Sequence, residues 1–240
     1  MWSTITTITK KPKELMSRGG IPRETPELIN NLDHKGVKKI VCGVHHSIVL
    51  TNTDKMYAFG KGSYGAMGTG NQDTVSYKNP AEVNFFEKNK VAVKDVVVGE
   101  WHSVFLTTDG SVYTCGYGGK SGILNRLFSK DMGALGHGDT DHQLLPRKIK
   151  YFADKKIKID KIAAGRFHTV ALSEEGDIYT WGRGHYGTLG TGESKPSSLP
   201  LLVESVKDFR KESPENVVTH IDSADSYTVA MTSILLCINF

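Results

Sequence analysis

The fold of this 240-residue chain is decided by the stretch Gly99-Glu100-Trp101-His102-Ser103-Val104-Phe105-Leu106, which returns in two other places with small changes. The other copies begin at Gly43 and Gly165, and in all three a histidine and then a serine or threonine follow the glycine at the same distance. A turn and a second run then lead to another glycine, always 17 residues after the first. Because the copies begin 56 and 66 residues apart, the chain has the period of a propeller or solenoid.

Each copy has the composition of a β-hairpin. In the second copy, two short runs rich in β-branched and aromatic residues flank Asp109-Gly110, which is a strong hairpin signal. Glu175-Gly176 stands at the same place in the third copy, and Asn52-Thr53-Asp54 in the first. No stretch has a convincing apolar stripe at helical spacing, and the best helical candidates, residues 13–16 and 205–211, are brief. The sequence therefore predicts an all-β fold with radial or linear repetition.

Glycines also repeat in the second half of each unit. The pattern Gly-x-Gly-x-x-Gly-x-x-Gly-x-Gly begins at Gly60 and again at Gly182, whereas an insertion at 119–132 interrupts it in the middle unit. Such glycines let the backbone adopt positive φ and lie close to a neighbouring strand. A proline closes each unit, and we expect the residues after it to enter the next outer strand; these prolines are Pro80, Pro146 and Pro200.

A fourth unit begins at Ile221 but departs from the others. Ala224 replaces the first glycine and Tyr227 replaces the histidine. After Thr232 the pattern stops, and residues 233–240 contain neither an Asp-Gly turn nor a Tyr-x-x-Gly run. We therefore expect no further turn or strand after Thr232.

Two complete units match a known repeat signature, which is a Gly-x-x-His-[Ser/Thr] strand followed by Asp-Gly, Tyr-x-Trp-Gly and Gly-x-Leu-Gly-x-Gly. The second unit matches it at Gly99, His102, Ser103, Asp109, Gly110, Tyr113, Gly116, Leu135, Gly136 and Gly138. The third unit matches it at Gly165, His168, Thr169, Gly176, Tyr179, Trp181, Gly182, Leu189, Gly190 and Gly192. Over residues 40–232 the chain thus resembles the regulator of chromosome condensation family. The resemblance implies a β-propeller of four-stranded blades, seven in the family's usual form, of which this chain would hold three or four.

The repeat frame divides the chain as follows. Residues 1–39 are expected to form an N-terminal segment that includes the outer strand of the first blade. The propeller repeats are 40–96, 97–161, 162–220 and a partial unit at 221–232, and 233–240 form a divergent tail. An open run of blades leaves the faces of its first and last members uncovered. Three explanations stay open: a piece of a longer protein, pairing or self-association through the open propeller ends, and a stable partial propeller.

Composition agrees with a globular chain of one sizeable core, and no apolar run approaches the length of a membrane span. The three cysteines favour a reducing compartment over a disulfide framework, and Cys42 and Cys115 should be small core residues because apolar residues occupy their positions in other units. We expect an intracellular protein, cytoplasmic or nuclear. Residues 1–18 are rich in serine, threonine and basic residues, which leaves a mitochondrial transit peptide as an alternative.

Several motifs imitate enzyme sites. The Gly-x-Gly-x-x-Gly runs at Gly60 and Gly182 match a dinucleotide fingerprint, but the glycines that follow forbid the helix that such a site needs. The equivalent histidines His46, His102 and His168 could suggest a metal ring, yet one histidine in every unit indicates a structural role repeated in each blade. The sequence therefore predicts no catalytic residue, no cofactor, no metal and no small-molecule substrate.

The first break in the symmetry is the insertion of the middle unit. It places apolar and basic side chains where the other units make a tight turn, and insertions of this kind map to one face, commonly the binding face. The candidate protein-binding residues are Lys120, Ile123, Leu124, Arg126, Leu127, Phe128 and Lys130. The alternative is a loop that packs on its own blade. A wedge at a similar place in the family's namesake helps to expel nucleotide from a small GTPase, although these residues do not clearly match it.

The second break is a basic stretch at 147–161, where seven cations face two acids. The alternation of lysine and isoleucine predicts a strand with one solvated face. As an alternative function, Lys155, Lys156 and Lys158 could attract an acidic partner in a salt-sensitive way. The net charge of +4 is too small to indicate general nucleic-acid binding.

Taken with the resemblance, these features predict a scaffold for protein partners that regulates a small GTPase or assembles a larger complex. The alternative is a guanine-nucleotide exchange factor, which acts without covalent chemistry. Ultraviolet sensing, a further role in the family, depends on clusters of tryptophan, and Trp101 and Trp181 do not supply one.

Overall fold

The computed structural model of the chain describes residues 29, 32, 35–75, 78–119, 133–212, 215–234 and 237–239. They form four antiparallel sheets, each built from consecutive strands. Blade 1 contains β1 (Val37–Cys42), β2 (His46–Thr51), β3 (Met56–Gly60) and β4 (Ala81–Glu82). Blade 2 contains β5 (Val93–Val98), β6 (His102–Thr107), β7 (Val112–Gly116) and β8 (Gln143–Lys148). Blade 3 contains β9 (Ile159–Ala164), β10 (His168–Ser173), β11 (Ile178–Gly182) and β12 (Ser197–Leu202), and blade 4 contains β13 (Val218–Ser223), β14 (Thr228–Thr232) and β15 (Cys237–Asn239).

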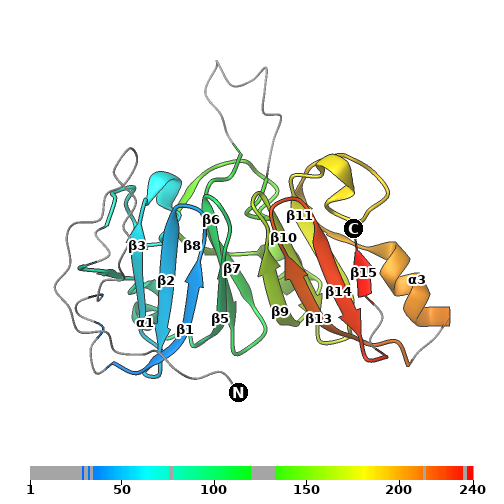
Figure 1. Cartoon of the computed structure of the whole chain (residues 1–240), viewed down its shortest axis with the longest axis horizontal. Helices are drawn as coiled ribbons and strands as arrows, with labels where there is room; N and C mark the ends of the chain where they lie inside the picture. Colours follow the sequence, from blue (N-terminus) through cyan, green and yellow to red (C-terminus); the bar gives the residue numbers. More distant parts are fainter. Residues whose placement is uncertain are drawn as a thin grey trace, which may run out of the picture.

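The blades follow one another along an arc, with the first strand of each blade innermost (Figure 1). Strand β5 contacts β1 on one side and β9 on the other, and β9 contacts β13. This arrangement confirms the expected all-β propeller architecture. Short helices precede the inner strands of blades 2 to 4, namely α1 (Phe85–Lys88), α2 (Lys150–Asp154) and α3 (Glu204–Glu212). Within the part of the chain that the structure describes, no helix is long and apolar enough to cross a membrane.

The chain enters each blade at the inner edge and leaves it at the outer edge. The described part of residues 1–39 contributes the start of the inner strand β1, and the rest of this segment, in which an outer strand is expected, lies outside the described residues. The outermost strand of blade 1 is β4, which begins directly after Pro80, whereas Pro146 and Pro200 lie within β8 and β12. Each proline therefore lies in the outer strand of its own blade or directly before it, where the missing N–H leaves no gap in a ladder.

The repeat and the blade are offset by a few residues. The boundaries at 96/97, 161/162 and 220/221 cut through β5, β9 and β13. Each inner strand begins with valine or isoleucine, a few residues before the boundary that the repeat gives; these residues are Val37, Val93, Ile159 and Val218. The hairpins themselves lie where the sequence predicts them.

Blade 4 continues beyond the point where the repeat pattern ends. Strand β15 pairs with β14, placing Cys237 opposite Met231 and Ile238 opposite Ala230. The expectation that residues 233–240 contain no further strand was therefore wrong. The physical reason is that Ile238 packs against the core between blades 3 and 4, so an apolar residue completes the hairpin without an Asp-Gly turn.

The helices were predicted less well than the strands. Helix α3 confirms the candidate at 205–211, while the candidate at 13–16 lies outside the described residues. The basic stretch 147–161 is not one continuous strand, because α2 forms within it. Phe152 of α2 is buried between blades 2 and 3, and this contact outweighs the strand-like alternation of lysine and isoleucine.

Three apolar cores lie between consecutive blades. Each blade presents two residues of its second strand to the blade that follows, and we name this side its forward face; the pairs are Ile48 and Leu50, Val104 and Leu106, and Val170 and Leu172. Cys115 is buried in the first of these cores, as the sequence predicts. Cys42 is exposed instead, because its position at the end of β1 faces the centre of the arc rather than a neighbouring blade.

A buried hydrogen-bond relay joins each blade to the next. His46 Nε2 lies 2.8 Å from Ser103 Oγ of blade 2, and the serine hydroxyl donates to the Ala66 carbonyl of blade 1 at 2.7 Å. Because that hydroxyl has one proton, the imidazole N–H must donate to it. The same relay runs from His102 through Thr169 to the Ala134 carbonyl, and from His168 through Thr228 to the Thr188 carbonyl. The predicted structural role of the histidines is thus confirmed, with a side-chain hydroxyl rather than a backbone group as the first partner.

The glycine that opens each copy is required by space rather than by backbone conformation. A Cβ on Gly43 would lie 2.4 Å from the Gly99 carbonyl oxygen, and one on Gly165 would lie 2.5 Å from the Ala224 carbonyl oxygen. The loops of neighbouring blades therefore approach each other closely only where a side chain is absent. The glycine and the histidine together define how two blades join.

His102→Ala should destabilise the protein by about 2–4 kcal/mol, because it leaves a cavity and removes the hydrogen bond that the buried Thr169 hydroxyl accepts. Urea unfolding would measure this change. The matched control is Tyr227→Ala at the equivalent position of blade 4, where the side chain is 53% exposed. That control should change stability by no more than about 0.5 kcal/mol. Equal effects of the two substitutions would contradict a structural role for the relay.

Stability should fall as the pH drops from about 6.5 toward 4. Burial lowers the pKa of His46 and His168 from 6.5 to about 4 and that of His102 to about 3. In this interval the unfolded state binds more protons than the folded state, so protons favour unfolding by up to about 1.4 kcal/mol per pH unit and histidine. Between pH 7 and pH 5, the free energy of unfolding should fall less for His102→Gln than for the wild type. The control His185→Gln, on the surface, should lose as much stability as the wild type.

Candidate protein-binding face

The loops that follow the inner strands gather on one side of the arc, at the top of Figure 1. We name this side the loop face; it comprises the loops 43–45, 99–101, 165–167 and 224–227, and the glycine-rich segments that contain η1 (Ser63–Gly65) and η3 (His185–Gly187). The hairpin turns and the helices α1 and α2 lie on the opposite side, which we name the turn face. Within the loops, the two residues between glycine and histidine differ in every blade. The surface that they form therefore varies, while the strands beside them keep the same structure.

Aromatic rings cluster where blades 1 and 2 meet on the loop face. The imidazole of His45 stacks on Trp101 with ring centroids 3.8 Å apart, and the Lys61 ammonium lies 5.0 Å from the centroid of the Trp101 ring. Tyr64 contacts the edge of Trp101 and also approaches Tyr117, at centroid distances of 5.9 and 4.9 Å. A set of half-buried rings is thus held by mutual contact, with polar edges available to a partner.

Glu100 anchors the charged groups of this face. Its side chain is 7% exposed, and its carboxylate pairs with Arg166 Nε of blade 3. The other carboxylate oxygen lies 3.4 Å from His45 Nε2 of blade 1, so one buried acid bridges three blades. The hydrogen bond to Glu100 raises the pKa of Arg166, which keeps the guanidinium charged, and Arg166 also lies 3.5 Å from Asp225 of blade 4. An exposed arginine is therefore fixed in place by a buried partner.

Blade 3 adds a second aromatic and cationic group. The guanidinium groups of Arg166 and Arg183 lie 5.1 and 5.7 Å from the centroid of Phe167. Tyr186, at the centre of η3, has a positive φ of 60° and a side chain that is 87% exposed. This left-handed conformation is uncommon for a residue other than glycine, and here it directs a large ring away from the protein.

The seven residues predicted to dock a partner through the insertion lie outside the described residues: Lys120, Ile123, Leu124, Arg126, Leu127, Phe128 and Lys130. The structure does place the residues that flank the insertion. Gly119 accepts a hydrogen bond from the Tyr117 hydroxyl, and Tyr117 contacts Tyr64 of the loop face. Gly119, the last residue that the structure describes before 120–132, therefore lies at the loop face, next to the aromatic cluster.

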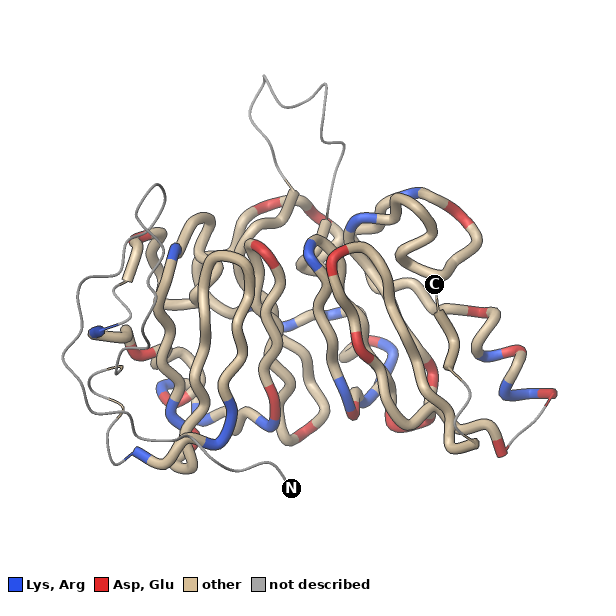
Figure 2. Tube along the Cα trace, viewed as in Figure 1, with Lys and Arg blue, Asp and Glu red and all other residues tan. Residues whose placement is uncertain are grey.

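The basic residues Lys155, Lys156 and Lys158 lie on the turn face, away from the loop face. Lys155 Nζ lies 4.4 Å from the centroid of Tyr151, and Lys158 Nζ donates to the Asp109 carbonyl. Two of the three cations thus have partners within their own blade and its neighbour. Lys and Arg are interspersed with Asp and Glu along the Cα trace in Figure 2.

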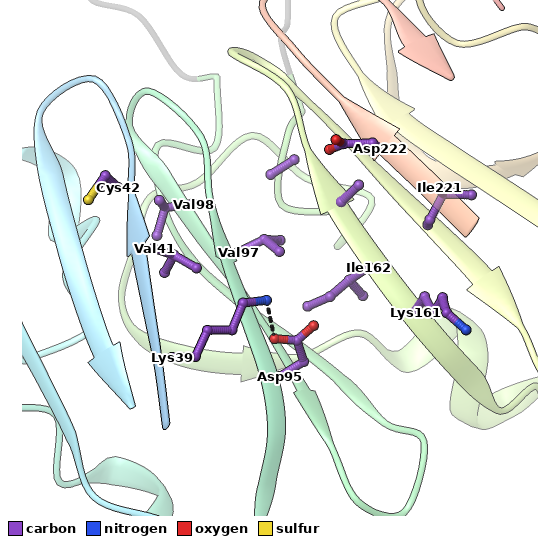
Figure 3. A pocket seen from close by; sticks show the side chains of 12 residues that line it. Lys39, Val41, Cys42, Asp95, Val97, Val98, Lys161, Ile162, Ile221 and Asp222 are labelled. Atoms are coloured by element: carbon purple, nitrogen blue, oxygen red, sulfur yellow. Dashed lines mark hydrogen bonds and ion pairs between the residues drawn. The ribbon is translucent and has the colours of Figure 1, made fainter. Parts of the chain in front are cut away.

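The inner strands of all four blades line an open cavity of about 420 Å³ at the centre of the arc. Its wall combines apolar residues with an ion pair between Lys39 and Asp95, whose charged atoms lie 2.5 Å apart (Figure 3). Lys161 and Asp222 line the same cavity from blades 3 and 4. The described residues contain no group of three side chains suited to hold a metal ion. The cavity lining presents no nucleophile hydrogen-bonded to a base, so the loop face is the stronger candidate site.

The loop-face residues lie within the repeats, but the sequence did not predict a function for them. Their signal was variation at fixed positions: Val44-His45, Glu100-Trp101, Arg166-Phe167 and Asp225-Ser226 occupy the same two places in successive loops. Because these side chains differ from blade to blade, they are not needed for the structure that the blades share. What the sequence could not supply was the contact between blades, such as that of Glu100 with Arg166 and His45.

Two family models, both described as "Regulator of chromosome condensation (RCC1) repeat", match the chain. One matches residues 37–66, 93–121 and 159–188, and the other matches residues 53–106, 129–172 and 175–231. The first set of matches begins at or next to the first residue of β1, β5 and β9, in the same frame as the blades. These matches cover more than half of the chain.

Curated relatives carry the same repeats. The chain is 30% identical over 184 residues to the ultraviolet-B receptor UVR8 of Arabidopsis thaliana, a match that covers 76% of this chain and 38% of the receptor. It is 28% identical over 191 residues to human protein RCC2, covering 75% of this chain and 36% of RCC2. The chain thus spans less than two fifths of the length of these two relatives.

Solved structures share the fold at lower identity. Human WBSCR16 matches with a TM-score of 0.65 and 18% identity, over 85% of this chain and 46% of that chain. Prp20p of Saccharomyces cerevisiae matches with a TM-score of 0.63 and 23% identity, over 81% of this chain and 43% of that chain. Together with the repeat matches and the four successive blades, these findings show that the chain belongs to the regulator of chromosome condensation (RCC1) repeat family.

Proposed function

We propose that this chain is a protein-interaction module whose binding surface is the loop face. The observation that carries the proposal is the set of aromatic and cationic side chains that blades 1 to 3 present there: Lys61, Tyr64, Trp101, Arg166, Arg183 and Tyr186. Tryptophan, tyrosine and arginine are the residues that most often dominate the binding energy of protein interfaces. Cations beside aromatic rings suit a partner with an acidic and partly apolar surface.

The rigidity of the frame supports this proposal. The buried relays fix the positions of the blades, and Glu100 holds Arg166 before any partner arrives. Side chains that are already ordered lose less conformational entropy on binding, so more of the contact energy contributes to affinity. Gly119, next to residues 120–132, lies at the same face, and we include the apolar and basic residues of that insertion in the proposed surface.

A second candidate function is guanine-nucleotide exchange on a small GTPase. The observation that favours it is the fold shared with Prp20p, a protein studied for its binding to Gsp1p and histones. At 23% identity this likeness concerns the fold, so the activity stands here as an alternative. In either function the chain would act through binding, without a covalent intermediate.

Affinity capture from the cells that produce the protein, followed by measurement with the purified partner, tests the proposal. Trp101→Ala and Tyr186→Ala should each weaken binding about ten-fold or more, which corresponds to roughly 1.4 kcal/mol. The control is the triple variant Lys155→Glu, Lys156→Glu and Lys158→Glu on the turn face, which should bind normally. If the triple variant loses binding and its salt dependence while the loop-face variants keep theirs, the site is the basic stretch instead.

Replacing residues 120–132 with a two-residue turn like Ser63-Tyr64 should leave stability within about 1 kcal/mol, because blades 1 and 3 close this segment without an insertion. Binding should weaken by several kcal/mol if clustered apolar anchors such as Leu127 and Phe128 contribute to it. If the partner is a small GTPase, the same replacement should slow the release of a fluorescent guanine nucleotide. Intact binding after the replacement would remove the insertion from the surface.

A further inference from the structure

The forward faces of blades 1, 2 and 3 share one design. Each has a glycine without a Cβ at the loop, a buried histidine that donates to the next blade, and apolar second-strand residues in the core. Each also has an apolar inner-strand residue opposite the first of those second-strand residues; these are Val41, Val97 and Ala163. The three junctions therefore share one frame, and in the third His168 Nε2 also lies 2.7 Å from Ser223 Oγ.

Blade 4 keeps the receiving half of this design. Thr228 Oγ1 lies 3.0 Å from His168 Nε2, and the Ala224 carbonyl stands where the Gly99 and Gly165 carbonyls stand in the earlier junctions. The loop also closes in the same way, because the Ala224 N–H donates to the Tyr227 carbonyl at 3.1 Å, as Gly165 does to His168. Blade 4 is thus a normal partner for blade 3.

The forward half of the design is missing from blade 4. Ala224 and Tyr227 replace the glycine and the histidine, and Asp222 stands where the other blades have Val41, Val97 and Ala163. A Cβ at this glycine position would lie 2.4–2.7 Å from the carbonyl of the next blade in the three existing junctions. At the positions equivalent to Asp222, Val41 and Val97 are half-buried beside the central cavity and Ala163 is buried, so a carboxylate there would lose part of its water in such a junction, at an energetic cost.

The two loop replacements also depend on each other. A Cβ on Gly165 would lie 2.0 Å from the Cε1 atom of His168, and one on Gly99 would lie 2.2 Å from that of His102. Alanine and a buried histidine therefore cannot occupy these two positions together. In blade 4 the Cβ of Ala224 takes the space of the imidazole, and Tyr227 is turned outward with 53% of its surface exposed.

We propose that blade 4 is a terminal blade, whose forward face does not accept a further repeat in the register of the other junctions. The proposal concerns this face alone and is independent of the proposed binding function. It also opposes self-association in which blade 4 of one copy packs on blade 1 of another, because that contact would need the same forward face.

Grafting the blade 4 pair into blade 3, as Gly165→Ala with His168→Tyr, tests the proposal directly. Hydrogen exchange of the β13 and β14 amides should accelerate by about ten-fold or more, because the junction to blade 4 is lost. The β2 and β6 amides, at the junction between blades 1 and 2, serve as the internal control and should keep their protection. Unchanged protection of blade 4 in the grafted protein would overturn the proposal, because it would show that the Ala–Tyr pair supports a junction.

A second arm does not depend on the folding of that graft. The triple variant Asp222→Val, Ala224→Gly and Tyr227→His restores the forward face, and Ser47 of blade 1 is the equivalent of the acceptors Ser103, Thr169 and Thr228. Sedimentation should show an association constant about ten-fold higher or more than that of the wild type, and Ser47→Lys should reverse the gain. The proposal would be overturned if the wild type associates and Ser47→Lys abolishes this association. It would also be overturned if the triple variant shows no increase in its association constant. Tyr227→His alone should give no gain, since Ala224 occupies the space of the imidazole.

Discussion

The hydrogen bond from a buried imidazole to a hydroxyl on the next blade is the interaction on which the rest of this structure depends. It lies at the start of the second strand of each blade, next to the loop face, and it fixes the distance between neighbouring loops. The imidazole N–H donates to the hydroxyl and the hydroxyl donates to a carbonyl, in a region from which water is excluded, so an error in blade position would leave these buried polar atoms unpaired. The apolar cores give each junction its stability, whereas the relay selects one arrangement.

The close approach of the loops has a second effect. Because Gly43 and Gly99 carry no side chain, the following two residues of each loop come within reach of the loop beside them. Glu100 can then contact Arg166 on one side and His45 on the other, although 66 and 55 positions separate them in the chain. A constant backbone contact thus brings variable side chains from different repeats onto one surface, which is how a repeated fold acquires an individual site.

Most of the fold could be predicted from the sequence because the same short local motifs recur in each blade. The hairpins follow from Asp109-Gly110 and its counterparts, and the buried histidines follow from their recurrence. The errors concern segments whose structure depends on contacts with other blades. Helix α2 forms because Phe152 is buried between two blades, and β15 forms because Ile238 reaches the last core. The candidate site was predicted in part: the insertion was singled out, but the role of Glu100 depends on distances between blades that no local pattern contains.

The direction of the relay has a consequence for how such a chain matures during synthesis. Every imidazole donates forward, to a hydroxyl that is translated about 60 residues later: Ser103 follows His46, Thr169 follows His102 and Thr228 follows His168. During synthesis, the histidine of the most recently completed blade therefore has no relay partner until the next blade has been translated. Tyr227 stands at the corresponding place in blade 4, so this blade has no imidazole at that position to donate forward.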